Sequence, residues 1–355
     1  MSRDWQISKS AALGQQEFPR TPPIAIACGA GRRLYQGTGR GQAGKGGRMS
    51  SIREITRGLR FPEGPVAMPD GSVILVEIES GCLTRVTPDG RHQVIATTGG
   101  GPNGAAIGPD GKCYICNNGG FKWHKDADGV RPILQSDDYS GGRIERVDLQ
   151  TGKVERLFTG TAEIPLKGPN DIVFDAHGGF WFTDLGKARR FDLDRGGVFY
   201  GKADGSVIQA VIYPLLTPNG IGLSPDGSRL YVAETQPGRL WAFDITSPGQ
   251  IARRPFPSPN GGTLVAGLPG YQLFDSLAVD SAGNICVATL MNGGITVISP
   301  DGKSIEHVPM PDIYTTNICF GGPDLRTAYI TLSSSGRLVA MQWPRPGLSL
   351  NYLNT

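Results

Sequence analysis

The 355-residue chain contains little histidine and cysteine, with four residues of the former and six of the latter. It also contains no run of about 18 apolar residues, so no membrane-spanning helix is expected. Three motifs are missing as well: a P-loop, a dinucleotide-binding glycine motif behind a strand, and a Gly-x-Ser-x-Gly elbow. These absences argue against a membrane protein and against nucleotide, NAD and serine-hydrolase chemistry.

Two of the cysteines, Cys113 and Cys116, have the spacing of a redox motif but fall in a predicted strand. Residues three apart on a strand point to opposite faces, which disfavours a disulfide or a shared metal. We therefore expect these thiols to fill the core, in keeping with a reducing, cytoplasmic environment.

The positive charge of the chain is concentrated in residues 1–48. This segment holds eight basic and two acidic residues, a net +6, so the whole-chain charge of +3 leaves −3 for residues 49–355. The remainder therefore gives no indication of nucleic-acid binding. Residues 1–48 are expected to form a disordered basic extension, either a non-native addition before Met49 or a transit peptide. The lack of an amphipathic apolar stripe favours the first interpretation.

Six short segments share one pattern: a polar residue, a small residue, mostly apolar residues, and then a tight turn that in most cases ends in Gly. The leading residues are Glu63, Asn103, Asn170, Asn219, Asp275 and Thr316. They are separated by 40, 67, 49, 56 and 41 residues. Repetition near this period, with β-rich segments between Asp-Gly turns, predicts an all-β fold. The expected architecture is a six-bladed β-propeller of four-stranded antiparallel blades over residues 49–355.

Radial packing brings equivalent positions of all blades together, so we expect the leading side chains to converge at the central channel. Glu63 and Asp275 would supply carboxylates there, and Asn170 and Asn219 would supply amide oxygens. Hard oxygen donors without imidazole or thiolate suit Ca²⁺ better than Zn²⁺. Four protein ligands also leave coordination positions for water and substrate. The alternative is that these residues only shape turns at strand starts.

Two predicted loops between the second and third strands of a blade are long, from 117 to about 142 and from 185 to about 196. By strand direction they overhang the channel mouth that carries the leading residues. Long loops on a rigid scaffold usually carry function. We expect a lid or wall over the pocket, with Trp123 and either Arg189 or Arg190 available to contact substrate.

Several motifs together resemble the SMP-30/gluconolactonase-like family over about residues 55–343. They are Phe61-Pro-Glu-Gly-Pro65, Gly168-Pro-Asn-Asp-Ile172, Pro218-Asn-Gly220, Phe274-Asp-Ser276 and Leu230-Tyr-Val-Ala-Glu-Thr235. The resemblance implies a six-bladed propeller with one catalytic divalent ion, usually Ca²⁺, for which Mg²⁺, Mn²⁺ or Zn²⁺ could substitute. It also implies hydrolysis of sugar lactones and other lactones, and relatives cleave organophosphate P–F bonds.

The resemblance assigns roles residue by residue. Glu63, Asn170, Asn219 and Asp275 match the metal ligands, and Asp275 also matches the proposed base or nucleophile. Sugar-lactone members often carry an Arg two residues before the Asn that matches Asn170, and this chain has Gly168 there. An aldonolactone substrate is therefore less well supported than lactonase activity itself.

Four further residues are candidates for substrate binding. Asn103 heads its repeat and would contact substrate, hold the metal through water, or cap its turn. Thr316 heads the sixth repeat. Asp184 ends a strand near the rim, where it would steer substrate or simply be solvated. His124 lies on the longer loop, where it would contact substrate or remain exposed.

These observations together predict a Ca²⁺-dependent hydrolase that opens a small-molecule lactone, with Asp275 as general base or nucleophile. The alternatives are an organophosphate P–F hydrolase using the same site and a non-catalytic propeller scaffold. No nucleic-acid or membrane partner is expected, and the sequence does not define an oligomeric state.

Overall fold

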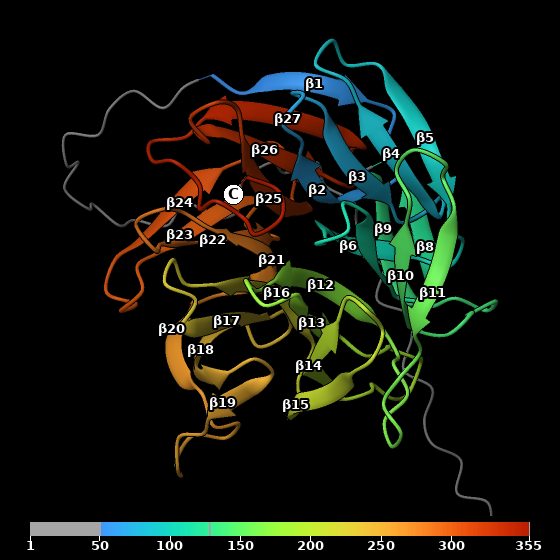
Figure 1. The fold of residues 1–355 in the computed structure, drawn as a ribbon. Helices are drawn as coiled ribbons and strands as arrows, with labels where there is room; N and C mark the ends of the chain where they lie inside the picture. The colour runs from blue at the N-terminus through green and yellow to red at the C-terminus, as the bar shows by residue number, and fades with distance from the viewer. Residues whose placement is uncertain (1–50, 128, 355) are drawn as a thin grey trace, which may run out of the picture. The chain divides into compact units, whose positions relative to one another are not determined.

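The computed structural model describes residues 51–127 and 129–354, so the extension expected over residues 1–48 lies outside the described residues. The chain divides into two units, Met1–Gly47 and Arg48–Thr355, and only the second contains described residues. Six antiparallel sheets surround a central channel as the blades of a β-propeller (Figure 1). The predicted all-β, six-bladed architecture is confirmed. Within the described part, no helix is long and apolar enough to cross a membrane.

Strands of the same rank occupy the same position in every blade, counted outward from the channel. The innermost strands are β2 (Pro62–Ala67), β6 (Pro102–Ile107), β12 (Pro169–Phe174), β16 (Pro218–Leu223), β21 (Leu273–Val279) and β25 (Thr315–Gly321). The second strands are β3 (Val73–Glu77), β7 (Cys113–Asn117), β13 (Gly179–Asp184), β17 (Arg229–Glu234), β22 (Ile285–Leu290) and β26 (Thr327–Leu332).

The outer half of each blade follows the same scheme. The third strands are β4 (Cys82–Val86), β10 (Arg143–Val147), β14 (Gly196–Lys202), β18 (Arg239–Ser247), β23 (Gly294–Ile298) and β27 (Arg337–Gln342). The outermost strands are β5 (His92–Thr97), β11 (Val154–Phe158), β15 (Ile208–Leu215), β20 (Thr263–Gly267), β24 (Ile305–Pro309) and β1 (Arg53–Arg57). A short β19 (Gln250–Ala252) also pairs with β18. A separate hairpin, β8 (Phe121–Asp126) and β9 (Gly129–Gln135), lies in the long loop of the second blade.

The circle of blades closes by a strand exchange between the two ends of the propeller. Strand β1 pairs antiparallel with β27, with Arg53 opposite Ala340, and becomes the outer strand of the sixth blade. The first and last strands of the propeller are therefore hydrogen-bonded within one sheet, which holds the ring of blades closed.

Aromatic and aliphatic side chains fill the space between neighbouring blades. Between the second and third blades, Tyr114, Phe174 and Phe180 form a cluster with ring centroids 5.0–5.7 Å apart. Cys113 and Cys116 are buried free thiols on β7, and burial raises the pKa of Cys113 to about 12. Their predicted core-filling role is confirmed.

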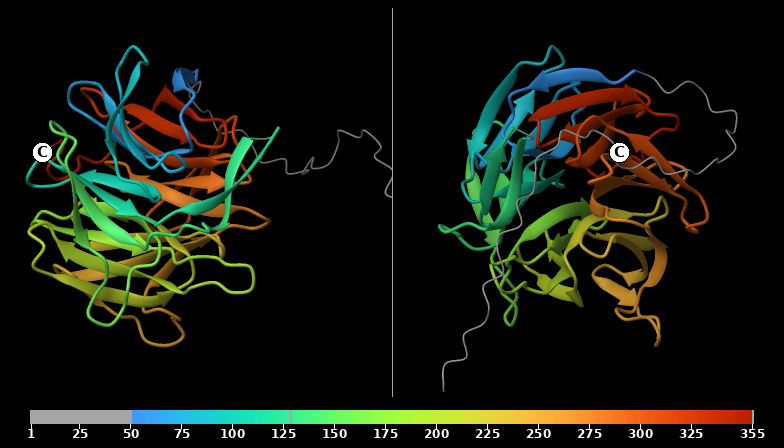
Figure 2. Two further views of the ribbon diagram at one scale, coloured as in Figure 1. Left: turned by 90° about the vertical axis from the view of Figure 1, so that its right-hand side faces the viewer. Right: turned by 180° about the vertical axis from the view of Figure 1, so that it is seen from behind.

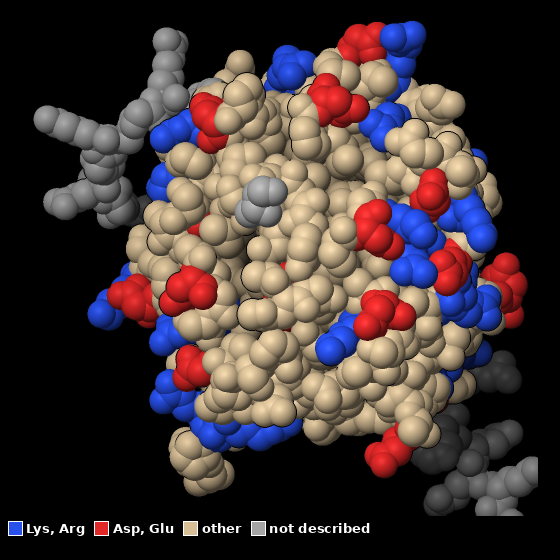
Figure 3. All heavy atoms as spheres, in the orientation of Figure 1, with Lys and Arg blue, Asp and Glu red and all other residues tan. Residues whose placement is uncertain are grey.

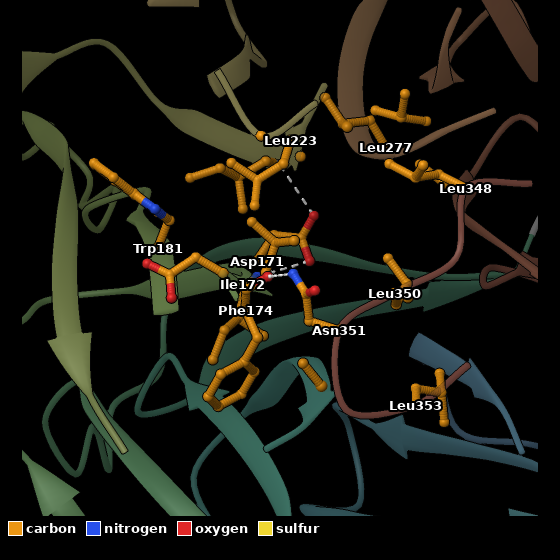
Figure 4. A pocket seen from close by; sticks show the side chains of 18 of the residues that line it. Asp171, Ile172, Phe174, Trp181, Leu223, Leu277, Leu348, Leu350, Asn351 and Leu353 are labelled. Carbon is orange, nitrogen blue, oxygen red and sulfur yellow. Dashed lines mark hydrogen bonds between the residues drawn. The ribbon is translucent and has the colours of Figure 1, made fainter. Parts of the chain in front are cut away.

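The end of the channel opposite the leading residues contains a cavity of about 610 Å³. Apolar side chains from the inner strands line it, including Ile172, Leu223 and Leu277 (Figure 4). Leu350 and Leu353 of the C-terminal segment complete the lining. Figure 3 shows that charged side chains on this face gather at the periphery and that the centre is uncharged.

The C-terminal segment, residues 347–354, crosses this cavity and is bonded to the inner strands. The backbone N–H of Leu348 donates to the Val279 carbonyl at 3.0 Å, and the Asn351 amide donates to the Phe174 carbonyl at 3.0 Å. Inner strands have a free edge toward the channel, so these bonds satisfy carbonyl groups that the sheets leave open. Figure 2 (left) shows the C-terminus and the β8–β9 hairpin on opposite faces of the propeller.

Candidate active site and metal centre

The site begins with an irregularity that all six inner strands share. In each of them the pairing with the second strand shifts at or beside the leading residue of the repeat, as between Glu63 and Val66 in β2. A β-bulge re-aims the side chains at the bulged positions. The repeated bulge therefore accounts for six polar leading residues at one end of strands that are otherwise apolar.

In three blades the residue after the leader is a glycine (Gly64, Gly104 and Gly220), and this choice has a steric cause. A Cβ built on Gly64 would lie 2.4 Å from the Asn103 carbonyl oxygen of the next blade, and one on Gly220 would lie 2.6 Å from the Asp275 carbonyl oxygen. The inner strands of neighbouring blades thus approach each other too closely for a side chain at these positions. This close approach brings the leading residues of successive blades together.

Glu63 and Asp275 lie in one buried electrostatic environment. Glu63 is 2% exposed and Asp275 is half-buried. Burial raises the pKa of Glu63 well above its ordinary value, and the nearby Asp275 raises it further. Burial also raises the pKa of Asp275 to about 7, with a further contribution from Asp171. Asp275 thus raises the pKa of Glu63, and Asp171 raises the pKa of Asp275; a bound cation would relieve this repulsion between like charges.

The two predicted amide ligands differ in their hydrogen bonds. Oδ1 of Asn170 is buried and has no hydrogen-bond partner, which is uncommon for a buried amide oxygen. The Asn219 amide nitrogen donates to Thr235 Oγ1 at 3.0 Å, and a hydrogen bond from Asn219 to Asp275 lowers the pKa of that carboxyl. The unpartnered oxygen of Asn170, at the repeat position where Glu63 and Asp275 carry carboxylates, fits a hard divalent cation.

The donor set is unusual in its composition. Among residues 51–127 and 129–354, no three His, Cys, Asp or Glu side chains converge as a metal-binding group. The candidate set instead combines two carboxylates, Glu63 and Asp275, with two amides, Asn170 and Asn219. It therefore has two negative charges and only oxygen donors, which is the chemistry expected for Ca²⁺ rather than Zn²⁺.

A second layer of polar residues supports the first, and the sequence analysis did not assign it a role. The Asn317 amide donates to Glu63 Oε2 at 2.7 Å, across the junction between the sixth and first blades. The Asp171 carboxylate accepts the backbone N–H groups of Ile172 at 3.0 Å and Ile221 at 3.2 Å. Both residues directly follow a leading residue, so the repeat pattern itself contained the signal for this layer.

The candidate substrate-binding residues occupy different environments. Asn103 is 5% exposed at the leading position of the second blade. Thr316 is buried, but its hydroxyl is bonded to Thr331 at 2.9 Å and Ser333 at 2.5 Å within the sixth blade. The Thr316 hydroxyl is therefore engaged inside its own blade.

Asp184 is neither solvated nor on an open rim. It is 3% exposed, and its carboxylate accepts three backbone N–H groups, from Lys167, Gly168 and Gly186, at 2.7–2.9 Å. Because these bonds occupy both carboxylate oxygens, its geometry is that of a residue that holds the loop after β13. A local signal for this role exists, since Asp at a strand end commonly binds the backbone of the turn that follows.

The β8–β9 hairpin carries a charged outer face and an aromatic inner face. His124 is exposed and lies 2.9 Å from Asp126 on the outer face. The neighbouring Trp123 points the other way and lies 5.0 Å from the Phe61 ring. The alternation of strand side chains therefore places Trp123, and not His124, on the side of the channel mouth.

The hairpin reaches from the second blade to the first and sixth blades. The Lys125 ammonium forms an ion pair with Glu79 in the loop of the first blade. The Val130 N–H donates to the Ser334 carbonyl in the loop of the sixth blade at 3.2 Å. The expectation of a lid over the channel mouth agrees with this placement, although the sequence analysis did not predict that the lid is a β-hairpin.

A fully buried lysine connects the two long loops. Lys187, from the loop after β13, donates to Asn118 Oδ1 at 2.8 Å and to the Gly120 carbonyl at 2.9 Å. Its ammonium also lies 3.8 Å from the centroid of the Phe121 ring. Burial lowers its pKa to about 7, against the opposing effect of Asp184 and Asp194. Lys187 thus fixes the base of the hairpin to the third blade.

The cavity at the other end of the channel is distinct from this site. It is lined by residues that follow the leading positions, and Asp171 and Asn317 lie at its inner end. Asp171, labelled in Figure 4, lines the cavity directly after a leading position, and none of the six leading residues belongs to the lining.

Comparison with known proteins places these features in a wider context. A family model described as the SMP-30/Gluconolactonase/LRE-like region matches residues 61–334. The chain is 26% identical over 298 residues to a gluconolactonase of Zymomonas mobilis, covering 76% of each chain. It is 29% identical over 264 residues to lactonase drp35 of Staphylococcus saprophyticus, covering 73% of this chain and 72% of the relative.

Two solved structures share the fold. A gluconolactonase of Xanthomonas campestris has a TM-score of 0.65 at 22% identity, covering 83% of this chain and 90% of that chain. A calcium-binding protein, regucalcin, of Agrobacterium tumefaciens has a TM-score of 0.63 at 20% identity, covering 85% and 98%. At these identities the likeness concerns the fold alone.

Proposed function

Because this chain belongs to the SMP-30/Gluconolactonase/LRE-like family, we propose that it is a divalent-cation-dependent hydrolase that opens lactone rings. The observation that carries the proposal is the buried Oδ1 of Asn170, which has no hydrogen-bond partner and stands at the same repeat position as the carboxylates Glu63 and Asp275. Two relatives named gluconolactonase and lactonase support the substrate class.

Four residues would hold the cation: Glu63, Asn170, Asn219 and Asp275. Their oxygens favour Ca²⁺, with Mg²⁺, Mn²⁺ or Zn²⁺ as substitutes. A bound cation of this kind supplies a Lewis acid that polarises a lactone carbonyl. Asn317 and Asp171 would keep the ligands in position, the first by its hydrogen bond to Glu63.

Of the two carboxylates among the candidate ligands, Asp275 is the one that can take part in the chemistry, because it is half-buried whereas Glu63 is almost inaccessible. As a general base, it takes a proton from the attacking water while the water oxygen bonds to the carbonyl carbon. As a nucleophile, it bonds to that carbon itself, and water then hydrolyses the resulting anhydride. In both routes the ring C–O bond breaks, and the alcohol oxygen that it releases takes up a proton. Asn103, at the leading position of the second blade, would contact the substrate or hold the cation through water.

The proposal is tested with Asp275→Asn, which keeps the shape of the side chain and removes its charge. Turnover of a lactone panel, measured as proton release, should fall by about 10³-fold or more, because both routes need the carboxylate. The melting temperature should change little. Asp137→Asn serves as the matched control, since Asp137 is exposed on the lid and pairs only with Lys122 among the described contacts.

Chelation supplies an independent test of the cation. Treatment with EDTA should abolish lactone hydrolysis, and added Ca²⁺ should restore it. Undiminished activity after complete chelation would contradict the metal assignment, and a near-normal rate for Asp275→Asn would contradict the role of this residue.

A further inference from the structure

We propose that the preferred substrate is a lactone that carries an apolar substituent, and not a polyhydroxylated sugar lactone. This inference rests on the proposed lactonase function and narrows it to a substrate class. Three observations carry it. Aromatic side chains form a wall beside the four candidate metal ligands, the nearby cationic side chains are already paired with other groups, and a side chain at Gly168 would be sterically blocked.

The aromatic wall consists of Phe61, Trp123 and Tyr314. The Phe61 ring lies 5.0 Å from Trp123 of the hairpin and 6.1 Å from Tyr314 of the sixth blade. Phe61 and Tyr314 each precede a leading residue by two positions, so they lie at the channel mouth, just outside the candidate metal ligands. Burial is the main cause of the raised pKa of Tyr314, and the charge of Asp275 adds a smaller contribution.

This wall is available for contact. Trp123 and Tyr314 are partly exposed, whereas Phe61 is buried between them. Phe121 extends the apolar surface, 6.1 Å from Trp123. Partly exposed aromatic side chains at the channel mouth favour apolar ligand groups, because contact removes apolar surface from water.

Recognition of a polyhydroxylated lactone requires polar side chains that are free to bind hydroxyl groups. The cationic side chains of the lid are engaged in ion pairs instead: Lys122 with Asp137, Lys125 with Glu79, and Arg131 with Asp126.

The cations of the second loop are also committed. Arg189 binds Asp192 and Asp194, and Lys187 is fully buried against Asn118 and Gly120. Arg190 is exposed and lies over the ring of Phe191, which is itself 89% exposed. Of the two loop arginines that were expected to contact substrate, Arg189 is thus paired with carboxylates and Arg190 is exposed beside an exposed ring.

The third observation is steric. A Cβ built on Gly168 would lie 2.4 Å from the Gly186 carbonyl oxygen, which is backbone and cannot simply rotate away. The Gly168 N–H also donates to Asp184 at 2.7 Å, and its carbonyl accepts the Leu185 N–H at 2.9 Å. An arginine cannot therefore enter the mouth from this position unless the loop after β13 moves.

The test compares three lactones with the same six-membered ring on the Ca²⁺-loaded full chain: δ-decalactone, δ-valerolactone and glucono-δ-lactone. The pentyl group of δ-decalactone should raise kcat/KM by about tenfold or more over δ-valerolactone, because one well-packed methylene is worth roughly 10- to 200-fold. Glucono-δ-lactone should be the poorest substrate of the three.

Trp123→Ala should reduce the δ-decalactone to δ-valerolactone ratio by about tenfold, because the wall loses its accessible aromatic ring. Trp123→Phe should restore most of that ratio. Lys122→Ala, on the outer face of the same hairpin, should leave the ratio unchanged. A lid that is merely loosened would lower kcat/KM for both lactones equally and leave their ratio intact.

Each result decides between the proposals. A preference for glucono-δ-lactone, or an unchanged ratio in Trp123→Ala, would overturn the substrate class while the lactonase function stands. No hydrolysis of any lactone by the Ca²⁺-loaded protein would overturn the proposed function and this inference with it.

Discussion

Replacement of the buried Lys187 by methionine should remove a specific pH dependence from the stability of this protein. Lys187 is fully buried, and burial lowers its pKa from 10.5 to about 7. The unfolded chain keeps the proton on this lysine up to its ordinary pKa. Between pH 7 and the ordinary pKa the unfolded state therefore binds more protons than the folded state, so stability rises with pH.

The size of the effect follows from the shift in pKa. Each pKa unit corresponds to about 1.4 kcal/mol, so the contribution of Lys187 to the free energy of unfolding should rise by roughly 2 kcal/mol between about pH 7 and pH 9. Methionine fills a similar volume without a charge. The acceptors that lose the ammonium each keep another donor: Asn118 Oδ1 keeps the Gly120 N–H at 2.9 Å, and the Gly120 carbonyl keeps the Ser136 N–H at 3.4 Å.

The assay is urea denaturation of the wild type and of Lys187→Met at several pH values across this range. The variant should be the more stable protein near pH 7, and its advantage should shrink by roughly 2 kcal/mol toward pH 9. Titrations common to both proteins cancel in the difference. Lys122→Met is the matched control, because Lys122 is an exposed lysine on the same lid. A constant difference between wild type and Lys187→Met across this range would refute the reasoning.

Three further outcomes follow from the same geometry. Added Ca²⁺ at about 100 times its Kd should stabilise the wild type by about 2.7 kcal/mol, measured as a rise in Tm, and should stabilise Asn170→Ala less. Gly168→Arg should lower the free energy of unfolding by roughly 1–3 kcal/mol, because its Cβ meets the Gly186 carbonyl. It should gain no activity on glucono-δ-lactone, and unchanged stability would contradict the steric block. Tyr352→Phe removes the hydroxyl that accepts the Gly178 N–H at 2.8 Å and should cost about 1 kcal/mol in urea denaturation.

The architecture and the leading residue of each blade could be predicted because they are specified by local, repeated patterns. Asp-Gly turns and β-branched segments define hairpins over a few residues, and six copies of one pattern define the blade count. The candidate ligands Glu63, Asn170, Asn219 and Asp275 stand at equivalent places in their repeats. Equivalent positions converge in a closed propeller, so the convergence of these residues could be predicted without knowing the structure of the loops.

The second layer and the lid could not be predicted in the same way. The bond from Asn317 to Glu63 joins residues 254 positions apart, across the junction that the strand exchange closes. The loop that contains Trp123 has no counterpart in the other blades, so no repeated pattern predicts its hairpin or its contacts with the first and sixth blades.

The sequence by itself determined the number of blades, the leading residue of each, and the oxygen-rich character of the ring, because strand period and turn chemistry are local properties. Only the tertiary structure decided which polar side chains are engaged and which are open. Asp184 became a loop anchor, Lys187 a buried connection and Trp123 part of the channel mouth. The reason is physical: burial and hydrogen-bond partners depend on groups brought together from distant parts of the chain, and no local pattern specifies them.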